Sequence, residues 1–450
     1  MNVISGAVHR PGTAGYDARR SGYNLVIEHR PAVVVEAVEV DDVTAAVRAA
    51  ADAGLPVAVQ ATGHGPSLPA DGALLIDTAG MSGVQVDPGA ATAWVAAGVR
   101  WQQVIAAAAP YGLAPLNGSS PVVGAVGYTM GGGIGMLGRR FGFAADHVRA
   151  VDLVTADGRP RRVTADREPE LFWAVRGGKC NFGVVTAMEI DLVPVAQLYG
   201  GGLYFGADAV PDALRAYAEW TRSVPDEMTS SVLMVDVPDI EAAPEPLRGR
   251  YVMHLRIAYC GSPEEGERWV APLRDAAPRL MDTVAVLPYE RVGSIHHEPT
   301  APGASYNRNV ALGALDAGAV EALLAAAGPR AGAPFAVELR HLGGAYARPP
   351  AVPNAVGGRD AAFSLSSMSL AAGADLDALR AAHDGLHERM RPWRTAGGLL
   401  NFLGVQDATV GTVRAAFDAA DYDRLIAVKA TYDPDNLFRV NHNIPPRRSS

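Results

Sequence analysis

Residues 60–66, with the sequence QATGHGP, decide the fold predicted for this chain. They follow a short apolar run at residues 55–59, so we expect a buried strand that ends in an exposed turn. Gly63 and Gly65 flank His64, and glycine lets the main chain turn tightly and bring its N–H groups close to a ligand. Rows of such N–H groups bind pyrophosphate, and His64 is the only strongly nucleophilic side chain in the turn. An ordinary loop histidine is the alternative that this stretch alone leaves open.

The composition limits the classes of protein that the chain could represent. Its 450 residues are enough for two or three domains. The 39 basic and 48 acidic side chains are scattered and give a formal charge of −9, which argues against nucleic acid or an anionic membrane as partner. Only Cys180 and Cys260 are present, so we expect neither a disulfide framework nor a metal site. No signal peptide and no run of about 20 apolar residues is evident, and we expect a cytoplasmic monomer or homodimer.

Periodicity predicts an α+β chain in three parts, 1–195, 196–400 and 401–450. In the first part we expect strands at 29–40, 55–59, 73–76 and 183–192, hairpins at 84–97 and 148–164, and helices at 41–54, 100–109 and 169–176. In the second part we expect strands at 251–258, 335–342 and 362–370, and helices at 211–223, 263–276, 319–327 and 375–390. Residues 118–138 are too glycine-rich for a regular element and predict a long functional loop. The third part, with a helix at 422–431, is expected to return to the first.

Residues 133–138, GIGMLG, match the GxGxxG pattern of Rossmann dinucleotide sites. That motif requires a strand directly before it, a helix after it and an acidic residue that ends the next strand. Here a glycine-rich loop precedes the pattern, and Asp152 begins a strand instead of ending one. We therefore do not expect a Rossmann unit.

A series of blocks in fixed order resembles a known family. The blocks are QATGHG, LIDTAGM, VAAGVRWQQV, GSSPVVGAVGYTMGGGIG, FGFAADHV, VTADG, PELFWAVRGGKCNFGVVT and YDPDNLFRVNHNIPP. They resemble the FAD-linked oxidases of the vanillyl-alcohol oxidase fold, in the branch of berberine-bridge-like enzymes and 6-hydroxy-D-nicotine oxidase. The resemblance covers residues 16–195 and 395–446 closely and the middle weakly. It implies a two-part FAD-binding domain (PCMH-type) and a substrate domain whose antiparallel sheet is covered by helices.

The resemblance implies FAD as cofactor, with its pyrophosphate on the turn at residues 60–66 and a covalent bond from His64 to the flavin 8α-methyl group. The turn residues implied are Gln60, Ala61, Thr62, Gly63, His64, Gly65 and Pro66. Many members of the family add a second link from a cysteine. Ser120 occupies that place here, and an alcohol cannot substitute for a thiolate, so we expect a single link. Cys180 falls where the family commonly has glycine, and we expect it to be a buried small residue.

Further FAD contacts follow from the same resemblance. They are expected at Ser119, Ser120, Val123, Gly124, Gly127, Tyr128, Gly131, Gly183, Val185, Asn441 and Asn443. Val123 matches a position where valine accompanies oxygen reactivity in the family. This favours an oxidase that uses molecular oxygen and produces hydrogen peroxide.

Four residues are candidates for the chemistry. Tyr128 would stabilise reduced flavin by a hydrogen bond, the logic of an oxyanion hole, or would merely pack. Glu338 and Arg340 alternate along one strand and share a face, so Glu338 could be a base or an amine anchor, with Arg340 its partner or a carboxylate clamp. A solvated Glu–Arg pair on an edge strand is the competing interpretation. Asn401 would bond the flavin or the substrate, or serve as an ordinary turn residue.

The expected reaction is hydride transfer from a C–H bond of a small amine, alcohol, sugar or secondary metabolite to FAD. Two departures from the family leave the substrate and the base open, since Arg348 stands where berberine-bridge enzymes have their glutamate base and Ile134 where aclacinomycin-type oxidases have a tyrosine. The alternatives are a dehydrogenase of the same fold that uses another electron acceptor, and a flavin-binding protein without turnover.

Overall fold

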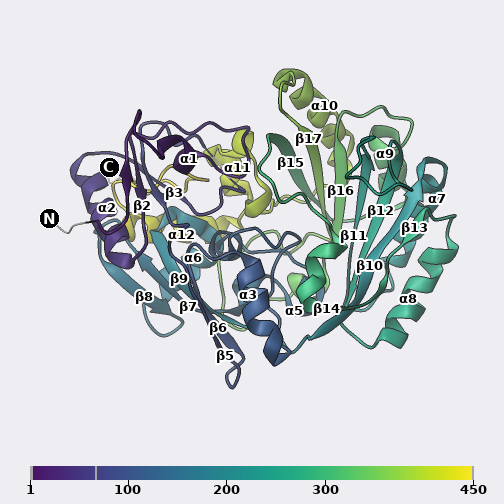
Figure 1. Cartoon of the computed structure of the whole chain (residues 1–450), viewed down its shortest axis with the longest axis horizontal. Helices are drawn as coiled ribbons and strands as arrows, with labels where there is room; N and C mark the ends of the chain where they lie inside the picture. Colours follow the sequence, from purple (N-terminus) through teal and green to yellow (C-terminus); the bar gives the residue numbers. More distant parts are fainter. Residues whose placement is uncertain (1–3, 66–67, 448–450) are drawn as a thin grey trace.

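Three β-sheets organise the chain, which the computed structural model describes at residues 4–65 and 68–447. The elements from the first 195 residues form two sheets at the left of Figure 1, and the strands that follow form the large sheet at the right. The α+β class is confirmed.

The four-stranded sheet has the order β1-β2-β4-β3, with β2, β4 and β3 parallel. Its strands are β1 (Val8–His9), β2 (Val33–Glu36), β3 (Val57–Gln60) and β4 (Leu74–Asp77). Helix α2 (Val40–Asp52) packs on it through Val43, Val47 and Ala50, the predicted apolar positions. The strand predicted at 29–40 was too long, because the Asp42 carboxylate accepts hydrogen bonds from the main chain of Val38 and Glu39 and turns the chain into α2.

The five-stranded sheet has the order β5-β6-β9-β7-β8 and is antiparallel throughout. Its strands are β5 (Val84–Asp87), β6 (Thr92–Ala96), β7 (Val148–Val154), β8 (Pro160–Thr164) and β9 (Val184–Asp191). Helices α3 (Trp101–Ala108) and α6 (Pro169–Gly178) match the prediction. The prediction that residues 118–138 lack regular structure was wrong in part, because they contain α4 (Ala125–Met130), which buries Ala125, Val126, Thr129 and Met130.

The eight-stranded sheet has the order β13-β10-β12-β11-β16-β17-β15, with β14 paired to β10. Its strands are β10 (Gln197–Gly206), β11 (Met228–Asp236), β12 (Tyr251–Tyr259), β13 (Met281–Asp282), β14 (Ala285–Pro288), β15 (Ser305–Leu312), β16 (Ala336–His341) and β17 (Phe363–Leu370). Its pairs are antiparallel, as predicted.

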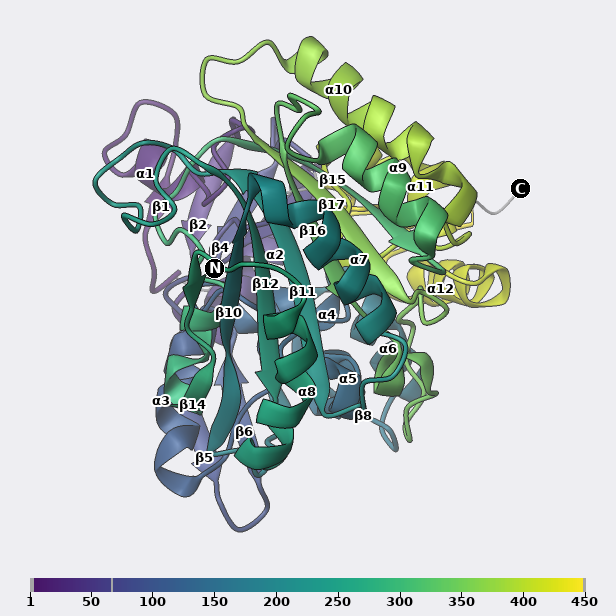
Figure 2. The ribbon, with the colours of Figure 1, turned by 90° about the vertical axis from the view of Figure 1, so that its right-hand side faces the viewer.

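Four helices cover the outer face of this sheet (Figure 2). They are α7 (Val210–Trp220), α8 (Pro263–Asp275), α9 (Ala317–Ala327) and α10 (Leu376–Arg389). Leu339 and Val337 of β16 point into the apolar core under these helices. The alternating residues Glu338 and Arg340 therefore lie on the opposite face, towards the first part of the chain, as the strand periodicity predicted.

Residues 401–447 lie against the first part of the chain. Helices α11 (Val410–Ala415) and α12 (Ala419–Tyr432), yellow in Figure 1, lie beside the purple and blue elements, and α12 packs on α6. On this arrangement we propose that residues 1–195, 196–400 and 401–450 are the FAD-binding, substrate-binding and returning segments. Within the described ranges, no helix combines the length and the apolar character needed to cross a membrane.

Candidate functional site

The turn after β3 holds His64 in a defined state. The His64 ring stacks on Tyr23 with 3.8 Å between ring centroids, and its Nδ1 lies 2.9 Å from the Thr62 hydroxyl oxygen. Burial, together with Arg100, lowers the pKa of His64 to about 4, so the ring is neutral at pH 7. In the described part of the chain, its buried Nε2 has no hydrogen-bond partner. The Thr62 hydroxyl group can accept from or donate to Nδ1, and in the tautomer with the proton on Nδ1 the Nε2 lone pair is free.

Glycine is required beside His64. Gly63 has a φ of 65°, and a Cβ atom there would lie 2.4 Å from the Cα atom of Gly22. Pro66 of the predicted turn lies outside the described residues. Gln60 ends β3, and Ala61, Thr62 and Gly65 follow it as expected; a Cβ atom on Gly65 would meet no atom of the described residues within 4 Å.

The stretch that precedes α4 lies against this turn. A Cβ atom on Gly124 would be 3.4 Å from the Thr62 hydroxyl oxygen, so residues 118–124 and 60–64 are neighbours. Ser119 and Ser120 are buried in this stretch, Val123 is half-buried, and Gly127 on α4 has open space where a Cβ atom would be. The structure thus brings the two predicted cofactor segments together.

Tyr128 has a buried hydroxyl group with no hydrogen-bond partner among residues 4–65 and 68–447. Its ring packs edge-on against Trp101, with 5.5 Å between ring centroids. Burial raises the pKa of Tyr128 well above its usual value, so the phenol keeps its proton. It is therefore a donor without an acceptor.

Asn401 and Lys179 meet at the end of α4. A Cβ atom on Gly131 would clash with the Asn401 amide oxygen and with Cε of Lys179, and the Asn401 amide donates to the main-chain oxygen of Tyr128 at 2.7 Å. Lys179 has a φ of 55°, and its ammonium group reaches only the Leu400 main-chain oxygen, at 3.4 Å, within the described chain. Burial lowers the pKa of Lys179 to about 8. The sequence reasoning missed this lysine, although it stands in the RGGKCNFG block next to Cys180, the residue that departs from the glycine common in the family.

The other predicted cofactor residues are more dispersed. Gly183 and Val185 lie where β9 pairs with β7, and a Cβ atom on Gly183 would be 2.6 Å from the Val154 main-chain oxygen. The Asn441 amide donates to the main-chain oxygen of Phe438 and contacts Cys180, which is half-buried. The side-chain oxygens of Asn441 and Asn443 are buried and have no partner in the described part of the molecule.

These atoms fit an FAD molecule. FAD brings acceptors at its pyrophosphate and at the pyrimidine edge of its ring, and also donors at that edge. Along these segments, the described residues offer a phenol, an ammonium group with one long hydrogen bond, two amide oxygens, an imidazole nitrogen and the glycine backbone of two adjoining turns. Buried polar atoms of this kind need partners, and a bound dinucleotide would supply them.

Opposite these segments, the inner face of the eight-stranded sheet carries a buried group of charges. Strand register aligns Arg256 of β12, Ser231 of β11 and Arg340 of β16 across the sheet. Glu338 lies two residues before Arg340 on the same face of β16. Glu338 is 4% exposed, and its two oxygens lie 2.5 Å from Nη1 of Arg256 and 2.7 Å from Nε of Arg340. The edge-strand alternative is wrong, because β16 lies between β11 and β17.

The charges in this group fix one another's ionisation. Burial raises the pKa of Glu338, but Arg340 and Arg256 outweigh that effect and hold it below its usual value. Burial lowers the pKa of Arg340, but Glu338 and Glu298 outweigh it and raise the value overall. Glu338 is therefore a carboxylate committed to two guanidinium groups, which makes it a poor proton acceptor.

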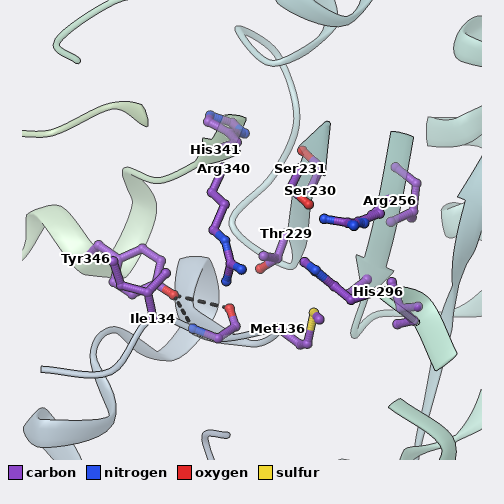
Figure 3. Close-up of a pocket in the computed structure, with 14 residues that line it drawn as sticks. Ile134, Met136, Thr229, Ser230, Ser231, Arg256, His296, Arg340, His341 and Tyr346 are labelled. Atoms are coloured by element: carbon purple, nitrogen blue, oxygen red, sulfur yellow. Dashed lines mark hydrogen bonds between the residues drawn. The ribbon is translucent and has the colours of Figure 1, made fainter. Parts of the chain in front are cut away.

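A pocket lies between this face and residues 134–136, and its space not filled by atoms is about 350 Å³ with the adjoining open solvent included. Arg340, Arg256 and His296 point towards its centre, and Ile134 and Met136 line the side of the first domain (Figure 3). Arg340 also donates to the Ser119 hydroxyl group at 3.1 Å, so the charged group reaches the predicted cofactor stretch. The guanidinium lies 5.6 Å from the ring centre of Phe402, next to Asn401.

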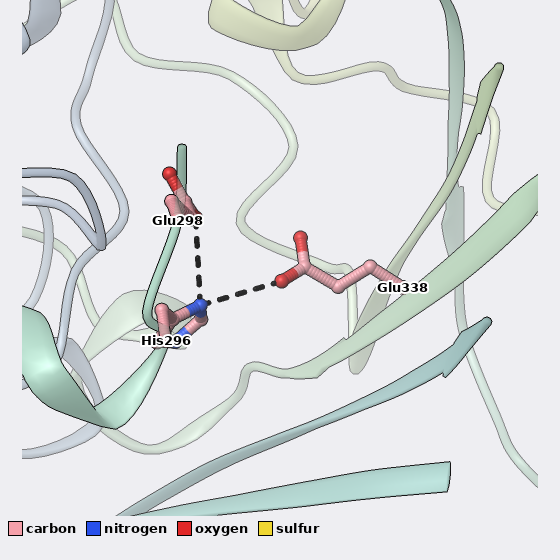
Figure 4. Close-up of side chains that lie close together, drawn as sticks. All are labelled: His296, Glu298 and Glu338. Atoms are coloured by element: carbon pink, nitrogen blue, oxygen red, sulfur yellow. Dashed lines mark ion pairs between the residues drawn. The ribbon is translucent and has the colours of Figure 1, made fainter. Parts of the chain in front are cut away.

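His296 and Glu298 were missed by the sequence reasoning. His296 is 6% exposed, and its Nδ1 lies 3.5 Å from a carboxylate oxygen of both Glu298 and Glu338 (Figure 4). The three side chains have the donor types and spacing of a metal site, but Arg256 and Arg340 already bind Glu338, and two guanidinium groups would repel a cation. The run His296-His297-Glu298 was the only signal in the sequence, and nothing local indicated its partner on β16.

Comparison with known proteins agrees with this geometry. The family model described as FAD binding domain matches residues 31–164, and the model described as Berberine and berberine like matches residues 401–445. The chain is 29% identical to (R)-6-hydroxynicotine oxidase of Paenarthrobacter nicotinovorans, over 99% of this chain and 98% of that protein. It is 26% identical to an FAD-linked oxidoreductase of Dictyostelium discoideum, over 98% of this chain and 95% of that protein.

Among solved structures, 6-hydroxy-D-nicotine oxidase from Arthrobacter nicotinovorans is similar, with a TM-score of 0.83, 26% identity and 99% of each chain covered. The predicted PCMH-type arrangement and FAD as cofactor are confirmed by these matches. The protein is an FAD-dependent oxidoreductase that belongs to the vanillyl-alcohol oxidase fold, in the berberine-bridge-like branch that includes 6-hydroxynicotine oxidase.

Proposed function

We propose that the protein is an oxidase of a small molecule. It binds FAD through one covalent bond to His64, removes a hydride from a C–H bond of its substrate, and passes the electrons to molecular oxygen to give hydrogen peroxide. The substrate is an amine, alcohol, sugar or secondary metabolite, and the similarity to 6-hydroxynicotine oxidase supports this size class.

The observation that carries this proposal is the state of His64. A bond to the flavin 8α-methyl group needs a neutral imidazole with a free lone pair. Thr62 engages Nδ1, and Nε2 is buried without a partner among the described residues, so we assign the bond to Nε2. Ser120 stands where a second link would need a thiolate, so the link is single.

FAD, when bound, supplies the hydride acceptor that the chain itself lacks. The residues of the first part hold it: the turns at 60–65 and 118–124 cradle phosphate with main-chain N–H groups, and the Lys179 ammonium group offers a positive charge to its polar end. Tyr128, Asn441 and Asn443 offer the unpaired hydroxyl and amide oxygens. Gly183 and Val185 would meet the adenosine end through their backbone.

The residues of the sheet hold the substrate. Arg340 is fixed by Glu338 and Ser119, so it presents a rigid donor to the pocket, and Glu338 acts by positioning both arginines. Asn401 has its amide nitrogen tied to Tyr128, which leaves its oxygen to accept from substrate or cofactor. Val123, half-buried beside Ser120, supports oxygen as the acceptor, because valine at this position accompanies oxygen reactivity in the family.

Acid precipitation of the purified protein tests the link. Yellow colour should stay with the wild-type precipitate and pass to the supernatant for His64→Ala, while His383→Gln, on the far face of the sheet, should keep it. Anaerobic addition of amines, alcohols and aldoses should bleach the flavin, and admission of air should restore the colour rapidly with one peroxide per turnover. Slow reoxidation would instead indicate a dehydrogenase, and a colour that no compound bleaches would indicate a flavin-binding protein without turnover.

A further inference from the structure

His296 lies beside two carboxylates on the wall of the pocket. Its Nδ1 lies 3.5 Å from Glu298 and 3.5 Å from Glu338, and its ring lines the pocket (Figures 3 and 4). Two carboxylates near Nδ1 favour the tautomer with the proton on Nδ1, because a carboxylate only accepts hydrogen bonds. The lone pair is then on Nε2, the nitrogen that remains for a ligand in the pocket. A neutral histidine with carboxylates beside one ring nitrogen and a free lone pair on the other has the disposition of a general base.

The segment that carries His296 lies at the junction of the two halves of the site. A Cβ atom on Gly293 would be 3.2 Å from Pro121, so the segment packs on the predicted cofactor stretch. Pro299 follows His296 in the same segment, and its main-chain oxygen accepts a hydrogen bond from the Tyr23 hydroxyl group. The ring of Tyr23 stacks on His64. His296 is thus held between the sheet and the two segments proposed to carry FAD.

The backbone at this place is strained. His297 has a φ of 52°, a left-handed conformation that costs a non-glycine residue of order 1 kcal/mol. The turn at His297 directs both His296 and Glu298 towards Glu338 of β16. Strain that is retained to bring three ionisable side chains together is typical of functional sites.

We propose that His296 is the general base of the reaction, and that Nε2 takes the hydroxyl proton of an uncharged alcohol or sugar while Glu298 and Glu338 stabilise the imidazolium. This rests on the proposed oxidase function and specifies its base and its substrate class. Glu338 cannot fill the same role, because both of its oxygens are bound to arginines.

The charge of the pocket selects an uncharged substrate. The positive charges of Arg256 and Arg340 offset the negative charges of Glu298 and Glu338, and His296 is neutral. An ammonium group would meet two guanidinium groups, with Glu338 already engaged. A hydroxyl group instead finds the donors of Arg340 and the hydroxyl groups of Thr229 and Ser231 on the same wall.

The step balances as follows for an alcohol. The O–H bond breaks, and its electron pair becomes the second bond of a carbonyl group. The hydrogen on the same carbon leaves with its two electrons as the hydride that FAD accepts, so the alcohol is oxidised by two electrons. The proton goes to Nε2 of His296, and the resulting imidazolium releases it to water after the product leaves.

The pH dependence follows from the groups that face His296. These are Glu298 of its own segment, Glu338 and Arg340 of β16, and Arg256 and His254 of β12. Burial holds the pKa of His296 well below 6.5, and Arg256 and Arg340 lower it further against the opposite effect of Glu338. The base is therefore free at neutral pH, and flavin reduction should be constant from pH 7 upward and decline only on strong acidification.

The test compares wild-type holoenzyme with His296→Gln, His296→Ala and the control His383→Gln, a buried histidine on the other face of the sheet. Anaerobic stopped-flow reduction is measured with glucose, xylose, cellobiose, glycerol and benzyl alcohol, and with benzylamine as the cationic compound. We expect alcohols or sugars to reduce the wild type, and both His296 variants to be about 10²- to 10⁴-fold slower with unchanged flavin content. The flavin difference spectrum on substrate binding should persist in His296→Gln, free imidazole should partly rescue His296→Ala, and the control should match wild type.

Each contrary result identifies what fails. Reduction of both His296 variants within threefold of wild type overturns His296 as the base while the oxidase remains. Reduction of wild type by benzylamine and by none of the hydroxyl compounds overturns the substrate class and with it this role for His296. Failure of every compound to reduce wild type overturns the proposed function itself.

Discussion

Two buried ion networks in this protein have similar chemistry and opposite character. In the returning segment, Lys429 lies on α12 and Asp433 lies at the C-terminal end of that helix. Both side chains are fully buried, with 2.6 Å between Nζ of Lys429 and a carboxylate oxygen of Asp433. Lys429 also donates to the main-chain oxygens of Asn181 at 2.7 Å and Phe438 at 3.0 Å. Asp433 accepts from the main-chain nitrogens of Leu437 and Phe438. Each polar atom of this pair therefore has a partner, and the pair joins α12 to the first part of the chain.

The group around Glu338 is also buried, but it is incomplete. Glu338 is satisfied by Arg256 and Arg340, whereas Nδ1 of His296, Nε2 of His254 and the Ser231 hydroxyl have no hydrogen-bond partner in the described part of the chain. This network opens on a pocket. A satisfied buried network is expected to stabilise the fold, and an unsatisfied one to bind something that completes it. The following experiments test that distinction.

The largest effect should come from breaking the satisfied network. Lys429→Met leaves the Asp433 carboxylate buried without its counter-charge, which typically costs about 3–5 kcal/mol. Urea unfolding followed by circular dichroism measures the loss. Arg380→Ala, which removes an exposed pair with Asp377 on α10, is the control and should cost about 0.5 kcal/mol or less. If Lys429→Met lost no more free energy of unfolding than the control, the satisfied network would not stabilise the fold, contrary to the distinction drawn above.

The two halves of the site, the cofactor segments and the charged group on the sheet, differ in how far the sequence predicts them. The cofactor half could be predicted because each of its segments carries its own signal: Gly63 must adopt a positive φ next to His64, and residues 118–138 are rich in glycine, although the two stretches meet only in the folded chain. The charged half could be predicted only in part. Alternation on β16 correctly placed Glu338 and Arg340 on one face, but Arg256 is 82 residues away from Glu338 and joins it only through the pairing of β12, β11 and β16.

Elements rich in glycine were missed for a physical reason. Strand β10 contains Gly200, Gly201 and Gly202, which lower the strand propensity, yet a Cβ atom on Gly200 would lie 2.6 Å from the Ile257 main-chain oxygen of the neighbouring strand. The glycines are there because β12 and β14 approach closely, which no local pattern reveals. In α4 the glycines likewise concealed an apolar helical face. Strands β11 and β15 were also not predicted.

An intermediate effect is expected for His383 of α10, which lies on the helix-covered face of the sheet and contrasts with His296. Both ring nitrogens of His383 have partners, Ser367 at 2.6 Å and Ser369 at 2.9 Å. Burial, together with Arg308, lowers its pKa to about 4. The unfolded chain takes up a proton near pH 6.5 and the folded chain does not, so stability is complete above pH 6.5 and is lost as the pH falls towards 4.

The loss attributable to His383 between pH 7 and pH 5 should be about 2 kcal/mol. Urea unfolding of wild type and His383→Gln at both pH values measures it, and the variant should show a smaller pH effect although it is less stable at pH 7. The neighbouring His387, whose pKa burial lowers to about 3, should contribute the remaining acid sensitivity of this face. An unchanged pH effect in His383→Gln would show that this histidine is already protonated in the folded protein.

The smallest change, and the most discriminating, concerns two buried serines on opposite faces of the sheet. Ser231 lies between Arg256 and Arg340 on the pocket wall, and its hydroxyl group has no partner within the described residues. Ser367 lies under α10 and bonds His383. Ser231→Ala removes an unsatisfied group, so the free energy of unfolding should change by less than about 0.5 kcal/mol, whereas Ser367→Ala should lose about 1 kcal/mol.

The kinetic effects of the two serine variants should have the opposite order to their effects on stability, with the larger effect in Ser231→Ala. If the Ser231 hydroxyl completes its hydrogen bonding with substrate, Ser231→Ala should raise KM several-fold with little change in kcat, and Ser367→Ala should alter neither. Denaturation and steady-state kinetics on the same preparations measure both quantities. A Ser231→Ala variant that loses stability and keeps its KM would mean that the hydroxyl supports the sheet, and that an unpaired buried polar atom on this face does not identify a ligand contact.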